Sequence, residues 1–176
     1  PFKQLLAAMS QNGDSFSVTL PEDWLQGRTA YGGLSAALCF EAAVRSNEKL
    51  PPLRSAQFAF IGPAVGELVI TPILLRRGKS AAFVGVDLVG EAGMAARALL
   101  CFGAERPSEQ MYLDIPAPAV PDANDSRDFF NRNGVPGFTQ HFRGRLADGA
   151  TPCTPDQDPD MTVWLRHADD DLPQGL

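Results

Sequence analysis

The sequence is poor in the residues that most often carry enzyme chemistry. Its 176 residues include only two histidines, His141 and His167, and three cysteines, Cys39, Cys101 and Cys153. These residues show no metal-ligand spacing, so we expect no metal site. The cysteines are odd in number, widely separated and without a Cys-x-x-Cys pair. This pattern favours the reduced thiols of a cytoplasmic protein over a disulfide framework.

The sequence also lacks a long apolar run and an excess of positive charge. No apolar stretch approaches the roughly 20 residues of a membrane-spanning helix, and no signal-peptide pattern opens the chain, so we expect no membrane partner. The formal net charge of -6 argues against nucleic acid as a partner. Residues 1–105 are balanced in charge, whereas residues 106–176 carry six Arg against twelve Asp and Glu.

What the sequence does contain is a glycine pair, Gly32-Gly33, in front of an almost uncharged run rich in Ala and Leu. Ala and Leu are strong helix formers, and the run predicts a helix over about 34–47 that is buried because it has little polar face. Its only charges, Glu41 and Arg45, are spaced as an i,i+4 pair. The glycines predict a turn, and the amides of the following helix N-terminus suit an acyl carbonyl, an anion or a phosphate. Close packing of a core helix is the alternative interpretation.

Strand patterns surround this helix. Apolar stretches between Gly and Pro turn signals predict strands at 16–20, 53–61, 67–77, 80–89 and 94–104. The last three follow one another through tight turns and predict an antiparallel meander. Pro72 predicts an edge position or a bulge in its strand. One buried helix before a long meander predicts an α+β fold with the sheet curled around the helix.

The second part of the chain is organised differently. Residues 106–136 are rich in Pro, Asp and Asn and predict an exposed linker, with a short helical turn near 128–130. Alternation predicts further strands over 138–146 and 161–167. The Pro- and Asp-rich stretch between them predicts a solvated loop.

Three features, in this order, resemble a known family. They are Ala30-Tyr31-Gly32-Gly33 before an apolar helix, Pro52-Leu53-Arg54-Ser55-Ala56-Gln57-Phe58-Ala59-Phe60, and Gly78-Lys79-Ser80 between two long strands. The combination resembles the acyl-CoA thioesterases of the double hot-dog type, the type II thioesterase-like family. The resemblance covers about residues 15–105, and a weaker similarity covers 137–176.

The resemblance implies a hot-dog fold, in which an antiparallel sheet wraps a long central helix. It implies an N-terminal hot-dog unit at 1–105, a linker at 106–136 and the start of a second, incomplete hot-dog unit at 137–176. The implied activity is hydrolysis of acyl-CoA to free acid and coenzyme A by an activated water, with no cofactor and no metal. We expect a cytoplasmic homo-oligomer, most simply a dimer, because a hot-dog sheet has open edges.

The resemblance also implies roles for residues at the glycine pair. Gly32 and Gly33 would contact the oxyanion or the pantetheine, and Tyr31 would line the acyl tunnel. Helix packing for the glycines, and a tyrosine that caps the core, remain the alternatives.

Catalytic groups are less well defined. Gln57 stands where some relatives carry His and would hydrogen-bond a water or the thioester. Glu41 would be a base, although it lies one residue out of the register of single-domain relatives. The principal acid is expected beyond Leu176, on the helix of the second unit. Arg76, Arg77 and Lys79 would meet the coenzyme A phosphates or form a solvated hairpin tip.

Two other functions remain open at this point. One is a non-catalytic hot-dog protein that binds acyl-CoA. The other is an acyl-thioester dehydratase or hydratase, which is disfavoured because that chemistry uses an Asp/His pair and the first unit has no histidine.

Overall fold

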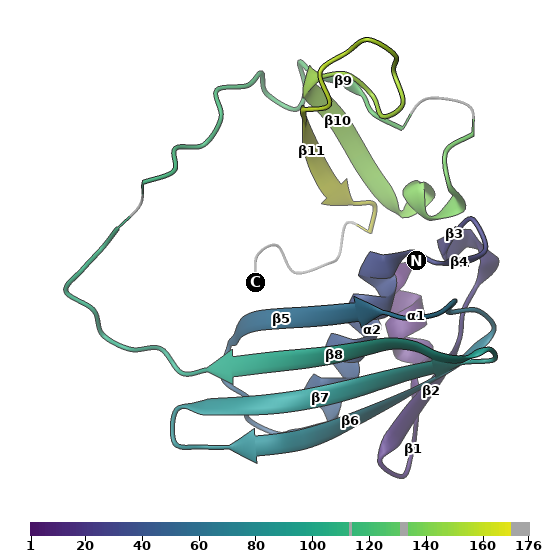
Figure 1. The fold of residues 1–176 in the computed structure, drawn as a ribbon, viewed down its shortest axis with the longest axis vertical. Helices are drawn as coiled ribbons and strands as arrows, with labels where there is room; N and C mark the ends of the chain where they lie inside the picture. The colour runs from purple at the N-terminus through teal and green to yellow at the C-terminus, as the bar shows by residue number, and fades with distance from the viewer. Residues whose placement is uncertain (113, 131–133, 170–176) are drawn as a thin grey trace. The chain divides into compact units, whose positions relative to one another are not determined.

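The structure is a computed structural model that describes residues 1–112, 114–130 and 134–169 (Figure 1). The chain divides into two units, Phe2–Pro107 and Ser108–Leu176, the second together with Pro1. The first unit contains the helices α1 (Phe2–Ala8), η1 (Glu22–Trp24, a 3-10 helix) and α2 (Gly32–Ser46). Its strands are β1 (Ser10–Asn12), β2 (Ser15–Thr19), β3 (Leu25–Gln26), β4 (Thr29–Ala30), β5 (Leu53–Phe60), β6 (Glu67–Arg77), β7 (Ala81–Gly90) and β8 (Gly93–Gly103).

Apolar alternation builds the main sheet of the first unit. Six strands form it in the order β1-β2-β6-β7-β8-β5, and every pairing is antiparallel. The predicted meander is confirmed as β6-β7-β8. Pro72 lies where β2 no longer pairs with β6, because that ladder runs only from Glu67 to Ile70. The edge position predicted for Pro72 is therefore confirmed, since proline has no amide hydrogen to donate there.

The helix α2 begins earlier than the sequence predicts. Tyr31 is its N-cap, and Gly32 and Gly33 are its first two residues. The predicted glycine turn at this point is wrong, because neither glycine has a positive φ. The turn lies instead at Gly27, with φ 70°, in a β3–β4 hairpin that the sequence did not predict.

The core of the first unit lies between α2 and one face of the sheet. α2 packs mainly on β6, β7 and β8, which are three of the four long strands of the sheet. The buried side of α2 consists of Leu34, Ser35, Leu38, Cys39, Ala42 and Ala43. Its other flank is apolar but incompletely covered, and Val44 is 40% exposed. The helix is therefore wrapped on one side only within this unit.

The second unit contains a smaller sheet. Its elements are β9 (Arg127–Asp128), the 3-10 helix η2 (Gly137–His141), β10 (Phe142–Gly149) and β11 (Met161–His167), with strand order β11-β10-β9. The strand predicted at 161–167 is confirmed. The helical turn predicted near 128–130 is wrong, because Arg127 and Asp128 pair with β10. In the described parts of the chain, no helix has the length and apolarity to cross a membrane.

The strand predicted over 138–146 is only partly correct, because its first residues form η2. Thr139 causes this difference. Its amide and its hydroxyl both donate to the carbonyl oxygen of Pro136, at 3.1 and 2.7 Å. A threonine that bonds the backbone three residues earlier favours a turn over a strand.

Candidate functional site

The start of α2 is held in place through the backbone of Tyr31. The Tyr31 amide donates to the carbonyl oxygen of Trp24 at 3.0 Å. The Tyr31 carbonyl accepts the amides of Leu34 and Ser35, at 2.9 and 3.2 Å. Trp24 is 2% exposed, so the first turn of the helix is anchored to a buried residue.

The amides of Gly32 and Gly33 are left as donors. Among the described residues, neither amide donates to an acceptor. The first amides of a helix have no partner within the helix, and the positive end of the helix dipole lies beside them. Two adjacent donors at this position can stabilise an oxygen that gains negative charge.

Aromatic rings lie around these two amides. A Cβ added at Gly33 would collide with the ring of Tyr31, whose Cζ would lie 2.7 Å away. A Cβ at Gly32 would lie 3.3 Å from Cζ of Phe60. The ring of Phe60 stacks on that of Phe58, with centroids 6.4 Å apart, and is 61% exposed. The glycines therefore allow close approach of aromatic side chains, and an apolar surface borders the amides.

The sequence did not single out Phe58 and Phe60 as site residues. Their alternate spacing in a strand does place both on one face of the sheet, and that signal was present. What the sequence lacks is the register that brings the end of β5 to the start of α2.

Gln57 is not brought to this site. It is exposed and lies between Ala56 and Phe58 on β5, so its side chain points to the opposite face from Phe58. Its direct neighbour across the ladder is Leu99, and it borders a hollow of about 570 Å³ on the outer face of the sheet. The structure therefore separates Gln57 from Gly32 and Gly33.

Glu41 also lies away from the two amides. It follows Gly33 by eight positions, which is roughly 12 Å along a helix. Its Oε1 accepts Nε of Arg45 at 2.7 Å. Arg45 in turn donates to the carbonyl oxygens of Leu6 and Met9, at 2.7 and 3.3 Å. The pair connects α2 to the end of α1, which is a structural arrangement.

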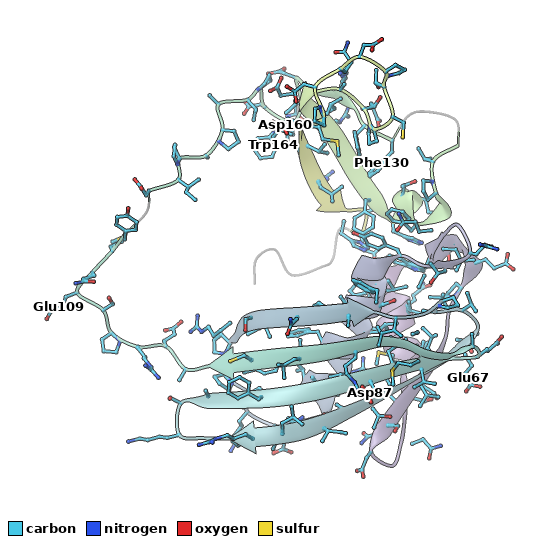
Figure 2. All side chains as sticks on the ribbon, viewed as in Figure 1. Glu67, Asp87, Glu109, Phe130, Asp160 and Trp164 are labelled. Atoms are coloured by element: carbon cyan, nitrogen blue, oxygen red, sulfur yellow. The ribbon has the colours of Figure 1, made fainter. Side chains whose placement is uncertain are left out.

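The outer face carries an ion pair that the sequence did not reveal as a pair. Arg97 on β8 donates to both carboxylate oxygens of Asp87 on β7, at 2.6 and 2.7 Å (Figure 2). The hydrogen bonds from Arg97 hold the pKa of Asp87 below its ordinary value. A register shift between Leu88 and Val89 brings the two residues opposite each other, so spacing from the hairpin turn alone did not indicate the pair.

The described cysteines give no nucleophile at the start of α2. Cys39 is fully buried, and burial raises the pKa of its thiol to about 12, with a smaller effect from the charge of Asp87. The thiol is therefore protonated near neutral pH. The cationic hairpin tip at Arg76, Arg77 and Lys79 is exposed, and Arg77 donates to the carbonyl oxygen of Glu48 at 3.1 Å.

Comparison with known proteins identifies the first unit. Residues 20–103 match the family model described as the acyl-CoA thioesterase N-terminal domain. No curated protein matches the sequence.

Solved structures share the fold. A conserved protein of unknown function with a hot-dog fold from Alicyclobacillus acidocaldarius superposes with a TM-score of 0.84, at 23% identity, over 95% of this chain and 62% of that chain. The acyl-CoA thioesterase II TesB2 of Mycobacterium marinum gives a TM-score of 0.70 at 18% identity, over 99% and 63% of the two chains. The tesB protein of Mycobacterium avium subs paratuberculosis gives 0.73 at 18%, over 99% and 64%.

The chain spans less than two thirds of the length of each of these three structures. The fold likeness covers nearly all of this chain, while the family model covers most of its first unit. Residues 20–103 match the model of the acyl-CoA thioesterase N-terminal domain, and the chain has the hot-dog fold.

Proposed function

We propose that the protein to which this chain belongs hydrolyses acyl-CoA thioesters to a free acid and coenzyme A. The observation that carries the proposal is the pair of unpartnered amides at Gly32 and Gly33, within the part of the chain that matches the thioesterase family. The first amides of any helix lack a partner within the helix, and what supports a thioester site here is that glycine leaves these two amides uncovered by a side chain.

In the proposed reaction the thioester oxygen accepts the amides of Gly32 and Gly33. Water attacks the carbonyl carbon, and the negative charge that develops on the oxygen is stabilised by the two donors. The carbon–sulfur bond then breaks, and coenzyme A leaves as a thiolate that takes up a proton. We propose that the base that activates the water is the acid expected beyond Leu176. Glu41 is unsuited to this step, because it is paired with Arg45 and lies two turns away.

We propose that Tyr31, Phe58 and Phe60 contact the acyl chain or the pantetheine next to the thioester. Their rings border the two amides, and the exposed area of Phe60 is available to an apolar ligand. Burial of an aromatic surface of this kind by a ligand is favourable, at about 25 cal/mol per Å².

We further propose that the protein is a cytoplasmic homo-oligomer, most simply a dimer. β5 forms the open edge of its sheet, and all of its residues except the half-buried Phe58 are exposed. An exposed edge strand of eight residues is a template for pairing with another strand. A second copy would also cover the apolar flank of α2. The widely spaced cysteines support a reducing compartment.

The test is release of free thiol from acyl-CoA substrates of graded chain length by the purified whole protein. We expect turnover that survives dialysis against a chelator, because the proposed chemistry uses amides and a carboxyl group only. Tight binding of acyl-CoA with no thiol released over hours would overturn the proposal and make the protein an acyl-CoA-binding module.

A further inference from the structure

One face of the small sheet in the second unit concentrates positive charge. Arg143 and Arg145 alternate along β10, and the ladder places Arg143 opposite Arg166 and Arg145 opposite Trp164 on β11. Directly opposite residues of an antiparallel pair point to the same side of the sheet. Three guanidinium groups and one indole therefore share a face, which we call the arginine face. It lies outside the region that matches the family model.

The two faces of this sheet have different surroundings. Gly144, between the two arginines of β10, is buried on the opposite face, where a Cβ would lie 2.8 Å from Cε2 of Phe130. The side chains of Arg143, Arg145 and Arg166 are instead exposed. Aromatic rings cover the opposite face at Gly144, whereas Leu165 on that face is 56% exposed, and the three arginine side chains of the arginine face all reach solvent.

The arginine face places like charges next to each other. Like charges placed directly opposite each other across a sheet are destabilising, and Arg143 and Arg166 are such a pair. Among the described residues, the guanidinium groups of Arg145 and Arg166 donate to no acceptor. Asp128 is the carboxylate opposite Arg145, and its Oδ1 accepts the amide of Phe130 at 3.0 Å. An anion on this face would offset the repulsion and accept from Arg145 and Arg166.

The face is also shaped for a ligand with an aromatic base. The Nε1 of Trp164 donates to the carbonyl oxygen of Pro121 at 2.9 Å, which fixes the indole, and the residue is 46% exposed. A hollow of about 780 Å³ is bordered by Arg143, Arg145, Arg166 and Trp164, and its lining also includes Phe130, Phe142, Gly144 and Leu165 from the other face of the sheet. This volume is in the range of small-molecule sites, about 300–1,000 Å³.

Guanidinium groups bind phosphate through paired hydrogen bonds, and an indole stacks on a nucleobase. We propose that the arginine face binds the phosphorylated adenine nucleotide of coenzyme A, with Arg145 and Arg166 on the phosphates and Trp164 on the base. The identity of this nucleotide rests on the proposed function. The site assigns head-group recognition to the second unit and leaves the hairpin tip at Arg76 and Lys79 as a solvated surface.

The experiment titrates the chain with coenzyme A and follows heat and tryptophan fluorescence. Only two tryptophans are present, and Trp24 is buried, so a change in emission reports Trp164. We expect the double variant Arg145→Gln/Arg166→Gln to bind coenzyme A at least roughly tenfold more weakly, which is the effect of one charged hydrogen bond. The matched control Arg76→Gln/Lys79→Gln should bind like the wild type.

Titrations with fragments of coenzyme A show which part of the ligand is bound. We expect pantetheine, which has neither phosphate nor base, to leave the fluorescence unchanged. Inorganic phosphate should compete only at much higher concentration than coenzyme A. Any of three results would overturn the inference. The double variant could bind coenzyme A as tightly as the wild type does, pantetheine could bind as tightly as coenzyme A, or inorganic phosphate could compete at the same concentration as coenzyme A.

This outcome is separable from that of the proposed function. If the whole protein hydrolyses acyl-CoA and Arg145→Gln/Arg166→Gln leaves KM unchanged, the proposed nucleotide site is wrong and the proposed hydrolysis is supported. If coenzyme A binding depends on these arginines while no thiol is released, the proposed nucleotide site is supported and the proposed hydrolysis is wrong.

Discussion

At the scale of single residues, the two glycines of α2 differ in what surrounds them. A side chain at Gly33 would enter the ring of Tyr31, whereas a Cβ at Gly32 would only touch Phe60 at 3.3 Å. The ring of Phe60 is exposed and can move by a few tenths of an ångström. We therefore expect Gly32→Ala to keep thioester hydrolysis within a few-fold of the wild type, as measured by thiol release. A loss as large as that of a Gly33 variant would show that the Phe60 side of the site is equally constrained.

A substitution at Glu41 tests whether this residue has a structural role on α2 instead of a catalytic one. We expect Glu41→Gln to leave hydrolysis nearly unchanged, because Glu41 bonds Arg45 and lies far from the amides. It should lower the free energy of unfolding by about 0.3–0.5 kcal/mol, the usual effect of a partly exposed i,i+4 pair. As a control, Arg45→Ala should cost more in chemical denaturation, because Arg45 also donates to two carbonyl oxygens of α1 and its C-terminal end.

His167 gives a pH dependence to the second unit. Burial lowers its pKa below the ordinary 6.5, Asp169 partly opposes this by raising the pKa, and His141 lowers it slightly further. Its Nδ1 accepts the amide of Asp169 at 3.2 Å, which requires that nitrogen to be unprotonated. The unfolded chain therefore binds the proton more readily, and stability falls as pH drops through 6.5 towards the lower folded pKa.

The measurement is the denaturant midpoint of the wild type and of His167→Gln across this pH range. We expect the wild type to lose stability towards acid more steeply than the variant. Parallel curves for the two proteins would show that His167 does not contribute to the pH dependence.

At the scale of elements, long strands were predictable and short ones were not. The alternation in β6, β7 and β8 is visible in the sequence because each strand buries one face. β11 also alternates, although none of its residues is fully buried. β3, β4 and β9 have two residues each, which is too short for a period, and they depend on partners brought by the fold. The start of α2 was missed because glycine is a poor helix former, and only the Tyr31 ring explains its presence there.

For the candidate site, features that depend on local sequence were predictable, and features that depend on strand pairing were not. The sequence proposed Gly32 and Gly33 because their position before an apolar helix is local information, and their role stays a prediction. The resemblance suggested that Gln57 bonds a water or the thioester, whereas the structure puts Gln57 on the face of β5 opposite to Phe58. The pairing of Asp87 with Arg97 and of Arg143 with Arg166 depends on strand register, which propensity alone does not determine.

The open edge of β5 makes a prediction about assembly. Ala56 is exposed on this strand, and a lysine there would oppose strand pairing by placing charge at the edge. We expect light scattering at micromolar concentration to report a dimer for the wild type and a monomer for Ala56→Lys. The control Ala92→Lys, in the exposed β7–β8 turn, should remain dimeric. A monomeric wild type would refute the proposed assembly, and a dimeric Ala56→Lys would place the interface elsewhere.

At the scale of the whole molecule, different parts of the chain have different proposed tasks. The first unit supplies amide donors and aromatic rings, and the second unit supplies an arginine face for a phosphorylated head group. The chain spans less than two thirds of the length of the solved structures described above, and the acid that activates the water is proposed, not located. The central claim is therefore that the first unit polarises the thioester and that the base comes from elsewhere in the protein.

The rate of thiol release by the whole protein carrying Gly33→Val tests this claim most directly. Gly33 has no positive φ, so valine fits the helical backbone while its side chain displaces the ring of Tyr31 and crowds the amides. The account predicts a loss of roughly 10²–10³ in kcat/KM, typical for a missing oxyanion donor, with a native circular dichroism spectrum. A wild-type rate for Gly33→Val together with loss of turnover in Glu41→Gln would contradict it, since the first unit would then supply the acid.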